Sequence, residues 1–155
     1  VNGWKVARWR GKLSNEARID LIFPGTKWCG SGNIASNFTD LGTSSAADSC
    51  CREHDNCPDI IEAGQTKYNL TNNSFYTKLI CKCDEEFYKC LKKNNDYTSY
   101  EVGLVYFDVL GTQCYKKDYP IVKCRKSNKV MKRCEDYELN ESLEKKWQWF
   151  DVPVY

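Results

Sequence analysis

The chain has 155 residues, ten cysteines and a net charge of +2, so it fits one domain that is long enough to bury a core, and we expect no nucleic-acid partner. No apolar run approaches the roughly 20 residues that cross a bilayer, and Val1-Asn2-Gly3 does not open a hydrophobic signal core. We therefore expect a mature, soluble, secreted chain.

The cysteines and the glycosylation sequons support this expectation. The cysteines are even in number, as expected if all are paired in an oxidising compartment. Sequons for N-linked glycosylation begin at Asn37, Asn69, Asn72 and Asn140, and they matter only for a protein on the secretory route. The sequence therefore predicts an extracellular, disulfide-rich glycoprotein.

Residues 1–20 differ in composition from the rest of the chain. They precede the first cysteine and carry five Lys or Arg residues against two acidic ones, together with Trp4 and Trp9. We expect a basic and aromatic N-terminal arm over residues 1–20 and a compact domain over residues 21–155. The indole rings would suit a lipid interface, whereas a docked strand or a propeptide remnant would explain the same composition.

A loop and a helix are the first predicted elements of the domain. Residues 24–33 are rich in glycine and favour a loop. Ser45, followed three positions later by Asp48, resembles an N-cap. The helix can continue to about Cys57, because Pro58 lacks the donor that would extend it.

This helix places cysteines and the only histidine of the chain on one face. Spacings of three and four residues align Cys50, Cys51, His54 and Cys57. The adjacent Cys50 and Cys51 point about 100° apart, so they should bond to different partners. His54 titrates near neutral pH and can accept or release a proton.

A second helix is expected over residues 75–93. Residues with apolar side chains recur there at helical spacing, namely Leu79, Ile80, Cys83, Phe87, Cys90 and Leu91. Asp84 belongs to the same stripe, and a carboxylate that points inward needs a partner. His54 is the natural candidate, because disulfides between the two helices would bring their faces together.

The rest of the pattern predicts a third helix over residues 99–110 and a short hairpin made by residues 119–122 and 130–137. Around the tip of this hairpin, residues 116–133 carry eight Lys or Arg residues against Asp118 alone. Such polarised charge suits an anionic surface, and ordinary solvated lysines are the alternative interpretation.

A histidine paired with a buried aspartate is typical of a general base and the carboxylate that orients it, so His54 and Asp84 are candidates for these roles. No nucleophilic side chain is obvious, so water is the more economical nucleophile, and a purely structural histidine is the alternative. Asp55 lies about 100° round the helix from His54 and could ligate Ca2+ together with carbonyl groups at Gly30 and Gly32. A plain glycine turn is the alternative for that loop.

A competing metal hypothesis assigns Zn2+ to the thiolates and imidazole of Cys50, Cys51, His54 and Cys57. It is disfavoured because cysteines of a secreted chain usually pair with each other. The chain also has no second histidine for a usual zinc ligand set.

Several short motifs stand out: Trp28-Cys-Gly-Ser-Gly, Cys50-Cys-Arg-Glu-His-Asp-Asn-Cys, Cys81-Lys-Cys-Asp, Tyr106-Phe and the ending Trp147-Gln-Trp-Phe-Asp. Together they resemble secreted phospholipase A2, and their cysteine spacing is similar to that of the group III branch, the bee venom type. The resemblance covers residues 21–155 and leaves residues 1–20 outside it.

The resemblance implies a mainly α-helical, disulfide-rich fold. Two long disulfide-linked antiparallel helices would carry the active site, accompanied by a third helix and a small β-hairpin. The family's pairing would join Cys29 to Cys51, Cys50 to Cys90, Cys57 to Cys83, Cys81 to Cys114, and Cys124 to Cys134.

The resemblance also implies calcium-dependent hydrolysis of the sn-2 ester of glycerophospholipids, which releases a fatty acid and a lysophospholipid. His54 would deprotonate the attacking water, Asp84 would orient His54, and Tyr106 would hydrogen-bond Asp84. The expected Ca2+ ligands are Asp55 and the carbonyl groups of Trp28, Gly30 and Gly32.

The expected partner is a phospholipid membrane surface, bound peripherally by a monomer. Lipid contact is assigned to the N-terminal arm and residues 116–133, or to apolar side chains such as Ile60 and Ile61 on a helix face. A cell-surface receptor is a further candidate partner, because a secreted ligand or toxin would signal without hydrolysis. A third hypothesis, that the protein is a disulfide-rich inhibitor, explains less of the sequence, because an inhibitor does not need a His and an Asp that point into the core.

Overall fold

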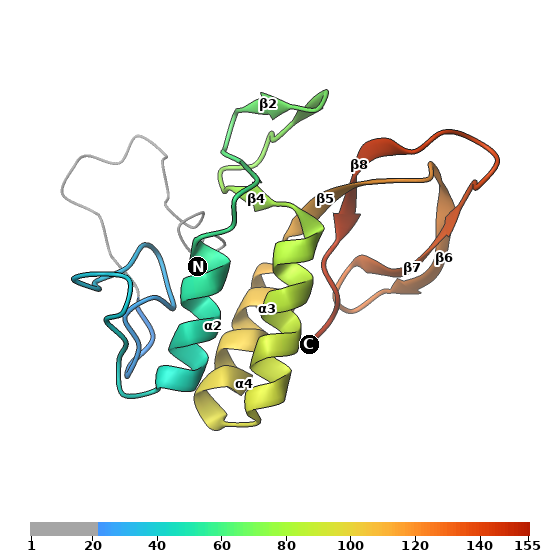
Figure 1. Ribbon diagram of the computed structural model, residues 1–155. Coiled ribbons are helices and arrows are strands. Elements are labelled where there is room, and N and C mark those ends of the chain that lie inside the picture. Colours follow the sequence, from blue (N-terminus) through green and yellow to red (C-terminus); the bar gives the residue numbers. More distant parts are fainter. Residues whose placement is uncertain (1–21) are drawn as a thin grey trace.

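The computed structural model describes residues 22–155, so the predicted arm over residues 1–20 lies outside the described residues. Two antiparallel helices, α2 (Ser45–Asp55) and α3 (Cys81–Asn94), lie side by side (Figure 1). The Cys50–Cys90 disulfide joins them. The disulfide-linked pair of helices expected from the sequence is therefore present.

Helix α2 agrees with the predicted helix except at its ends. Its N-cap is Ser44, and no side chain makes the capping hydrogen bond, so the predicted cap of Ser45 with Asp48 is wrong. The helix ends at Asp55, two residues before the predicted limit, because Asn56 leaves the helical conformation.

Helix α3 begins at Cys81 instead of residue 75. The chain before it is extended, since β4 (Lys78–Leu79) pairs antiparallel with β1 (Ile60–Ile61). Ile61 has no exposed surface. The suggestion that Ile60 and Ile61 lie on a lipid-contacting helix face is therefore wrong, because they form a short strand with one side chain in the core.

The predicted third helix is α4 (Tyr97–Gly103), which continues without a break into a π-helix, η1 (Leu104–Leu110). The side chain of Asp96 caps α4 by accepting a hydrogen bond of 2.8 Å from the amide of Ser99. π-Helices are rare and frequently occur at functional sites. This one buries two consecutive aromatic rings, Tyr106 and Phe107.

The strands form two-stranded antiparallel sheets. Besides β1 with β4, the described residues contain β2 (Thr66–Lys67) with β3 (Leu70–Thr71), β5 (Gln113–Asp118) with β8 (Lys146–Asp151), and β6 (Ile121–Asn128) with β7 (Arg133–Leu139). The pair β6–β7 is the predicted hairpin, longer than expected. Strands take nearly as many residues as helices, so the expected helices and β-hairpin are present but the mainly α-helical class is not confirmed.

The basic residues of β6 face acidic residues of β7. The ion pairs are Lys123 with Glu138 at 3.6 Å, Arg125 with Asp136 at 3.1 Å, and Lys126 with Glu135 at 3.6 Å. The buried Arg133 donates to the carbonyl groups of Phe107 and Asp108. Much of the positive charge of residues 116–133 is therefore either paired with acidic residues of the hairpin or, for Arg133, hydrogen-bonded to buried carbonyl groups.

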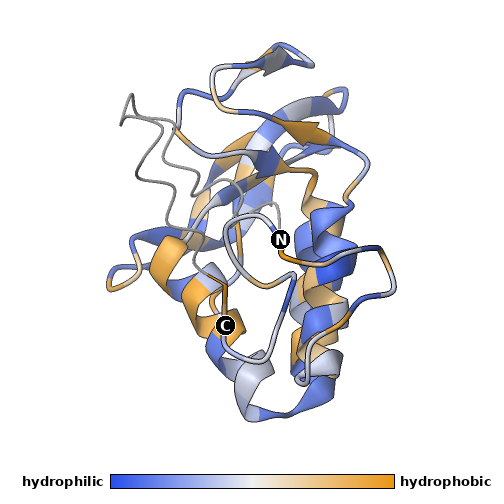
Figure 2. Cartoon of the chain, turned by 90° about the vertical axis from the view of Figure 1, so that its left-hand side faces the viewer, coloured by the Kyte–Doolittle hydropathy of each residue, from blue (hydrophilic) through white to orange (hydrophobic). Residues whose placement is uncertain are grey.

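The hydrophobic core lies where the helices meet the β5–β8 sheet. Apolar residues (orange) and polar residues (blue) alternate along the helices in Figure 2, as expected for helices with one buried face. Phe87 and Leu91 of α3 are four residues apart and pack in the same core cluster as Phe107 and Phe150. Burying each such side chain stabilises the fold by about 1.5–3 kcal/mol.

All ten cysteines form disulfides, namely Cys29–Cys51, Cys50–Cys90, Cys57–Cys83, Cys81–Cys114 and Cys124–Cys134. These are the pairs implied by the resemblance, and Cys50 and Cys51 have different partners as their geometry predicted. The bonds remove the zinc hypothesis, because no thiolate is left to bind the ion. Among residues 22–155, no helix is long and apolar enough to span a membrane.

Candidate active site

His54 of α2 and Asp84 of α3 meet between the two helices. Nε2 of His54 lies 2.6 Å from Oδ1 of Asp84, and the residues are only 2% and 1% exposed. The Cys50–Cys90 and Cys57–Cys83 disulfides hold the chain on either side of this contact. The contact predicted from the spacing of the two helical stripes is therefore present.

Tyr106 completes the surroundings of Asp84. Its hydroxyl donates a hydrogen bond of 2.6 Å to Oδ1 of Asp84, the same oxygen that contacts His54. Burial, together with the negative charge of Asp84, raises the pKa of Tyr106 well above its usual value. The phenol therefore stays protonated and remains a donor to the carboxylate.

The imidazole ring of His54 is held by aromatic contacts. The ring of Phe87 stacks on it with centroids 4.2 Å apart and planes inclined by 18°, and the ring of Tyr106 meets it edge-on at 5.0 Å. Burial lowers the pKa of His54 below its usual value, and the hydrogen bond to Asp84 opposes that shift. A neutral ring with Nε2 at Asp84 has Nδ1 as its proton acceptor.

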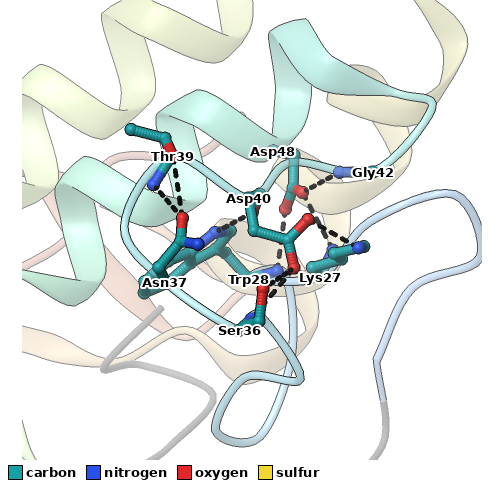
Figure 3. Close-up of polar contacts among 8 residues, drawn as sticks. All are labelled: Lys27, Trp28, Ser36, Asn37, Thr39, Asp40, Gly42 and Asp48. Carbon is teal, nitrogen blue, oxygen red and sulfur yellow. Dashed lines mark hydrogen bonds and ion pairs between the residues drawn. The ribbon is translucent and has the colours of Figure 1, made fainter.

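The loop before α2 is fastened to that helix by the buried carboxylate of Asp48 (Figure 3). Oδ1 accepts a hydrogen bond of 2.8 Å from the amide of Trp28. Oδ2 accepts from the amides of Lys27 at 2.9 Å and Gly42 at 2.8 Å. Such hydrogen bonds to a carboxylate are strong, and with the Cys29–Cys51 disulfide they fix the loop against α2.

Asp40 forms a second anchor on the outer side of the same loop (Figure 3). Its carboxylate accepts hydrogen bonds from Nζ of Lys27 at 2.6 Å and the amide of Ser36 at 2.9 Å. Its carbonyl group accepts from the indole of Trp28 at 2.9 Å. The hydrogen bond from Lys27 lowers the pKa of the Asp40 carboxyl.

Asp55 ends α2 and is only 6% exposed. In the fastened loop, Gly32 has a φ of 84°, a conformation that favours glycine. The carbonyl groups of Lys27 and Cys29 accept backbone hydrogen bonds from Ile34 and Phe23. Within residues 22–155, no three His, Cys, Asp or Glu side chains are grouped to hold a metal, so an ion here would need backbone oxygens.

The structure joins His54, Asp84 and Tyr106 by direct hydrogen bonds. The association of Asp55 with the carbonyl groups of Trp28, Gly30 and Gly32 stays a prediction.

Sequence reasoning missed the roles of Asp48 and Phe87. Asp48 lies three residues before Cys51 and seven before Asp55, and this helical spacing was the signal that its side chain faces the loop. Phe87 was assigned only to the apolar stripe of its helix, without its contact to His54.

Comparison with known proteins identifies the family. A family model described as Phospholipase A2 matches residues 22–118. The chain belongs to the phospholipase A2 family. Proteins named phospholipase A2 from Bombus pensylvanicus and Bombus terrestris are each 51% identical over 136 residues, which cover 87% of this chain and 100% of those proteins. One from Apis mellifera is 42% identical over 155 residues, 99% of this chain and 90% of that protein.

Membership of this family makes the protein an enzyme of the phospholipase A2 type, which hydrolyses phospholipids. The family assignment covers α2, α3 and η1 entirely. The buried contacts of His54, Asp84 and Tyr106 therefore lie in the part of the chain that matches the family model.

Proposed function

We propose that the protein is a secreted, calcium-dependent phospholipase A2 that cuts the sn-2 ester of glycerophospholipids at membrane surfaces and releases a fatty acid and a lysophospholipid. The observation that carries the proposal is the buried contact of His54 with Asp84, which also accepts a hydrogen bond from Tyr106. Burying ionisable groups is costly, so their retention inside the core of a family member is best explained by catalysis.

In this proposal, Nδ1 of His54 removes a proton from a water molecule whose oxygen attacks the ester carbonyl carbon. The protonated ring then gives that proton to the leaving alkoxide of the lysophospholipid. Asp84 keeps the ring from turning and stabilises its transient positive charge. Tyr106 and Phe87 hold Asp84 and the ring in place, which keeps Nδ1 directed at the water.

The donor chemistry near His54 fits calcium, which takes about six to eight oxygen ligands. Asp55 offers a nearly buried carboxylate, and Trp28, Gly30 and Gly32 offer carbonyl groups on the loop that Asp48 fastens to the same helix. The carbonyl groups of Lys27 and Cys29, which alternate with these, are used within the loop. When bound, the ion polarises the ester carbonyl group, and the Gly30 amide would donate a hydrogen bond to the oxyanion.

The test is hydrolysis of phosphatidylcholine vesicles, followed as fatty acid release. We expect turnover with Ca2+ present, loss of turnover when a chelator is added, and recovery when Ca2+ is returned in excess. Full turnover with the chelator present would contradict the calcium dependence. Acid released from the sn-1 position instead would contradict the proposed site of cleavage.

Membrane contact is a further part of the proposal, and its driving force can be tested with salt. The ion pairs of Lys123, Arg125 and Lys126 leave less basic charge free than the sequence suggests, whereas Ile34 and Tyr97 are 61% and 75% exposed. We therefore expect insertion of apolar side chains to dominate adsorption. Vesicle binding that weakens steeply with ionic strength would instead favour the basic residues.

Secretion is supported by the disulfides, because bonds of this kind form and persist in oxidising compartments. Peripheral attachment and a monomeric state complete the proposal. Size-exclusion chromatography with light scattering would test the monomer, with a mass near 18.0 kDa expected for the unmodified chain.

A further inference from the structure

All four glycosylation sequons of the chain lie in the described residues, beginning at Asn37, Asn69, Asn72 and Asn140. An N-linked glycan is attached to the side-chain nitrogen Nδ2 and is bulky. An asparagine that carries a glycan in the folded protein therefore needs an Nδ2 that reaches solvent and takes no part in the fold. The four asparagines differ sharply in this respect.

Three of the sequons share one local turn, in which Oδ1 of the asparagine accepts hydrogen bonds from the amide and the hydroxyl two residues later. The hydroxyl bonds are Thr39 to Asn37 at 2.7 Å (Figure 3), Ser74 to Asn72 at 2.6 Å and Ser142 to Asn140 at 2.5 Å. The amide bonds are 3.0, 3.1 and 3.0 Å long. Because Oδ1 faces the turn in each case, Nδ2 points away from it.

At Asn72 this nitrogen lies inside the fold. Nδ2 donates to the carbonyl groups of Ile61 at 2.9 Å and Tyr76 at 2.6 Å, so both of its hydrogens are used. Asn72 has no exposed surface. A glycan would replace one of these hydrogens and would have to enter a packed interior. Asn72 is therefore a structural residue that ties the loop after β3 to β1.

At Asn37 and Asn140 the same atom is directed out of the fold. Asn37 is exposed and Asn140 is partly exposed. Within residues 22–155, both side chains form hydrogen bonds through Oδ1 only. A glycan on either nitrogen would therefore replace no contact of the fold.

Asn69 is an acceptor of another kind. It occupies the turn between β2 and β3, where Tyr68 and Asn69 have φ values of 54° and 59°. Two successive residues with positive φ form the tight turn of a two-residue hairpin, for which asparagine is well suited. Asn69 is exposed at the tip of that hairpin, so its side chain can carry a large group without displacing a neighbour.

We propose that the secreted protein carries N-linked glycans on Asn37, Asn69 and Asn140, and that Asn72 stays unmodified although its sequon is complete. The donor is the lipid-linked oligosaccharide diphosphate of the secretory route. A bond forms between Nδ2 and C1 of the sugar, the bond from C1 to the diphosphate oxygen breaks, and Nδ2 loses one proton. The inference rests on the secretion stated in the proposed function, and it is independent of calcium and of His54.

Peptide-level mapping tests the assignment. The full chain, expressed behind a secretion signal in insect cells, is deglycosylated enzymatically in heavy-oxygen water, which converts each glycosylated asparagine to a heavy aspartate. Mass spectrometry should find the heavy label at Asn37, Asn69 and Asn140 and ordinary asparagine at Asn72. A label at Asn72 in the secreted protein overturns the exclusion, and a missing label at any other sequon overturns that assignment.

Two matched variants separate the neighbouring sequons. Thr71→Ala removes the sequon of Asn69, and the intact protein should lose the mass of one glycan. Ser74→Ala removes the sequon of Asn72, and the glycan mass should stay unchanged. Loss of a glycan in the Ser74→Ala protein contradicts the proposal. Vesicle hydrolysis by the same samples reports the proposed function separately, so either result can fail without the other.

Discussion

The helical region around His54 and the β6–β7 hairpin use charge in opposite ways. In the helical region, Asp48 and Asp84 are buried, and their hydrogen bonds come from backbone amides, His54 and Tyr106. In the hairpin, exposed Lys and Arg side chains pair with acidic ones across the strands. Exposed pairs contribute about 0–1 kcal/mol each, whereas a buried carboxylate left without its hydrogen bonds is strongly destabilising. Substitutions should therefore affect the two regions very differently.

The disulfides follow the same division. The Cys50–Cys90 bond joins α2 to α3, and the Cys57–Cys83 bond joins the segment just after α2 to α3. The Cys124–Cys134 bond links only β6 to β7. Cross-links in the helical region therefore lie on either side of the contact between His54 and Asp84, while the hairpin bond constrains only β6 and β7.

The largest effect is expected at His54. His54→Gln removes the base but keeps a polar side chain near Asp84, so hydrolysis of phosphatidylcholine vesicles should fall by roughly 100- to 10,000-fold. Glu53→Gln is the matched control, because Glu53 is the exposed neighbour in the same helix, and its activity should stay near that of the native protein. Undiminished hydrolysis by His54→Gln would contradict the proposed mechanism.

That variant also addresses a receptor-mediated role. A protein that signals only as a ligand should keep its effect on cells when His54 is replaced. An effect that requires hydrolysis should disappear together with the vesicle activity.

A loss at the lower end of that range is expected from Asp84→Asn, about 100-fold, because the amide cannot stabilise a protonated His54. The pH profile supplies the sharper test. Burial lowers the pKa of His54 below 6.5 and Asp84 opposes this shift, so removing the carboxylate should move the acid limb of kcat/KM to still lower pH. An acid limb that moves to higher pH in Asp84→Asn contradicts the role of Asp84 in stabilising the protonated His54.

A smaller effect again is expected from Tyr106→Phe. It keeps the Asp84 carboxylate, so vesicle hydrolysis should fall by only about tenfold.

The helical region was largely predictable from the sequence because its signals are local. The spacing of Cys50, His54 and Cys57 and the stripe that contains Asp84 and Phe87 place the buried faces correctly. The partners of the cysteines came from the resemblance to a family, since spacing alone leaves their pairing open.

The strand region was less predictable because its pairing is long-range. Strand β5 (Gln113–Asp118) pairs with β8 (Lys146–Asp151), and neither segment encodes the identity of its partner. Lys78–Leu79 would suit a helix, yet pairing with β1 draws it into an extended strand. The hydrogen bonds from loop amides to Asp48 depend on the loop conformation, which the sequence pattern does not specify.

A still smaller effect on turnover, but a distinct one on calcium, is expected from Asp48→Asn. Asparagine can still accept from Trp28, but its NH2 group opposes the amides of Lys27 and Gly42, so the loop should loosen. The Ca2+ concentration for half-maximal activity should rise about tenfold, with kcat at saturating Ca2+ changed far less. Asp40→Asn, at the outer anchor, is the control and should change it little. Unaltered calcium dependence in Asp48→Asn contradicts its role in positioning the loop.

The smallest effect on activity is expected from removing the hairpin disulfide. Cys124→Ser with Cys134→Ser should lower the free energy of unfolding by at most about 3 kcal/mol, because the closed loop is short, and vesicle hydrolysis should stay within about twofold of native, since β6 and β7 do not carry the site. Cys50→Ser with Cys90→Ser is the matched comparison. It should lower the free energy of unfolding by about 4 kcal/mol. It should also remove most of the activity, because α2 and α3 lose the covalent bond that holds His54 next to Asp84. Equal losses of activity in the two double variants would show that the hairpin takes part in positioning the site, and the division between the two regions would fail.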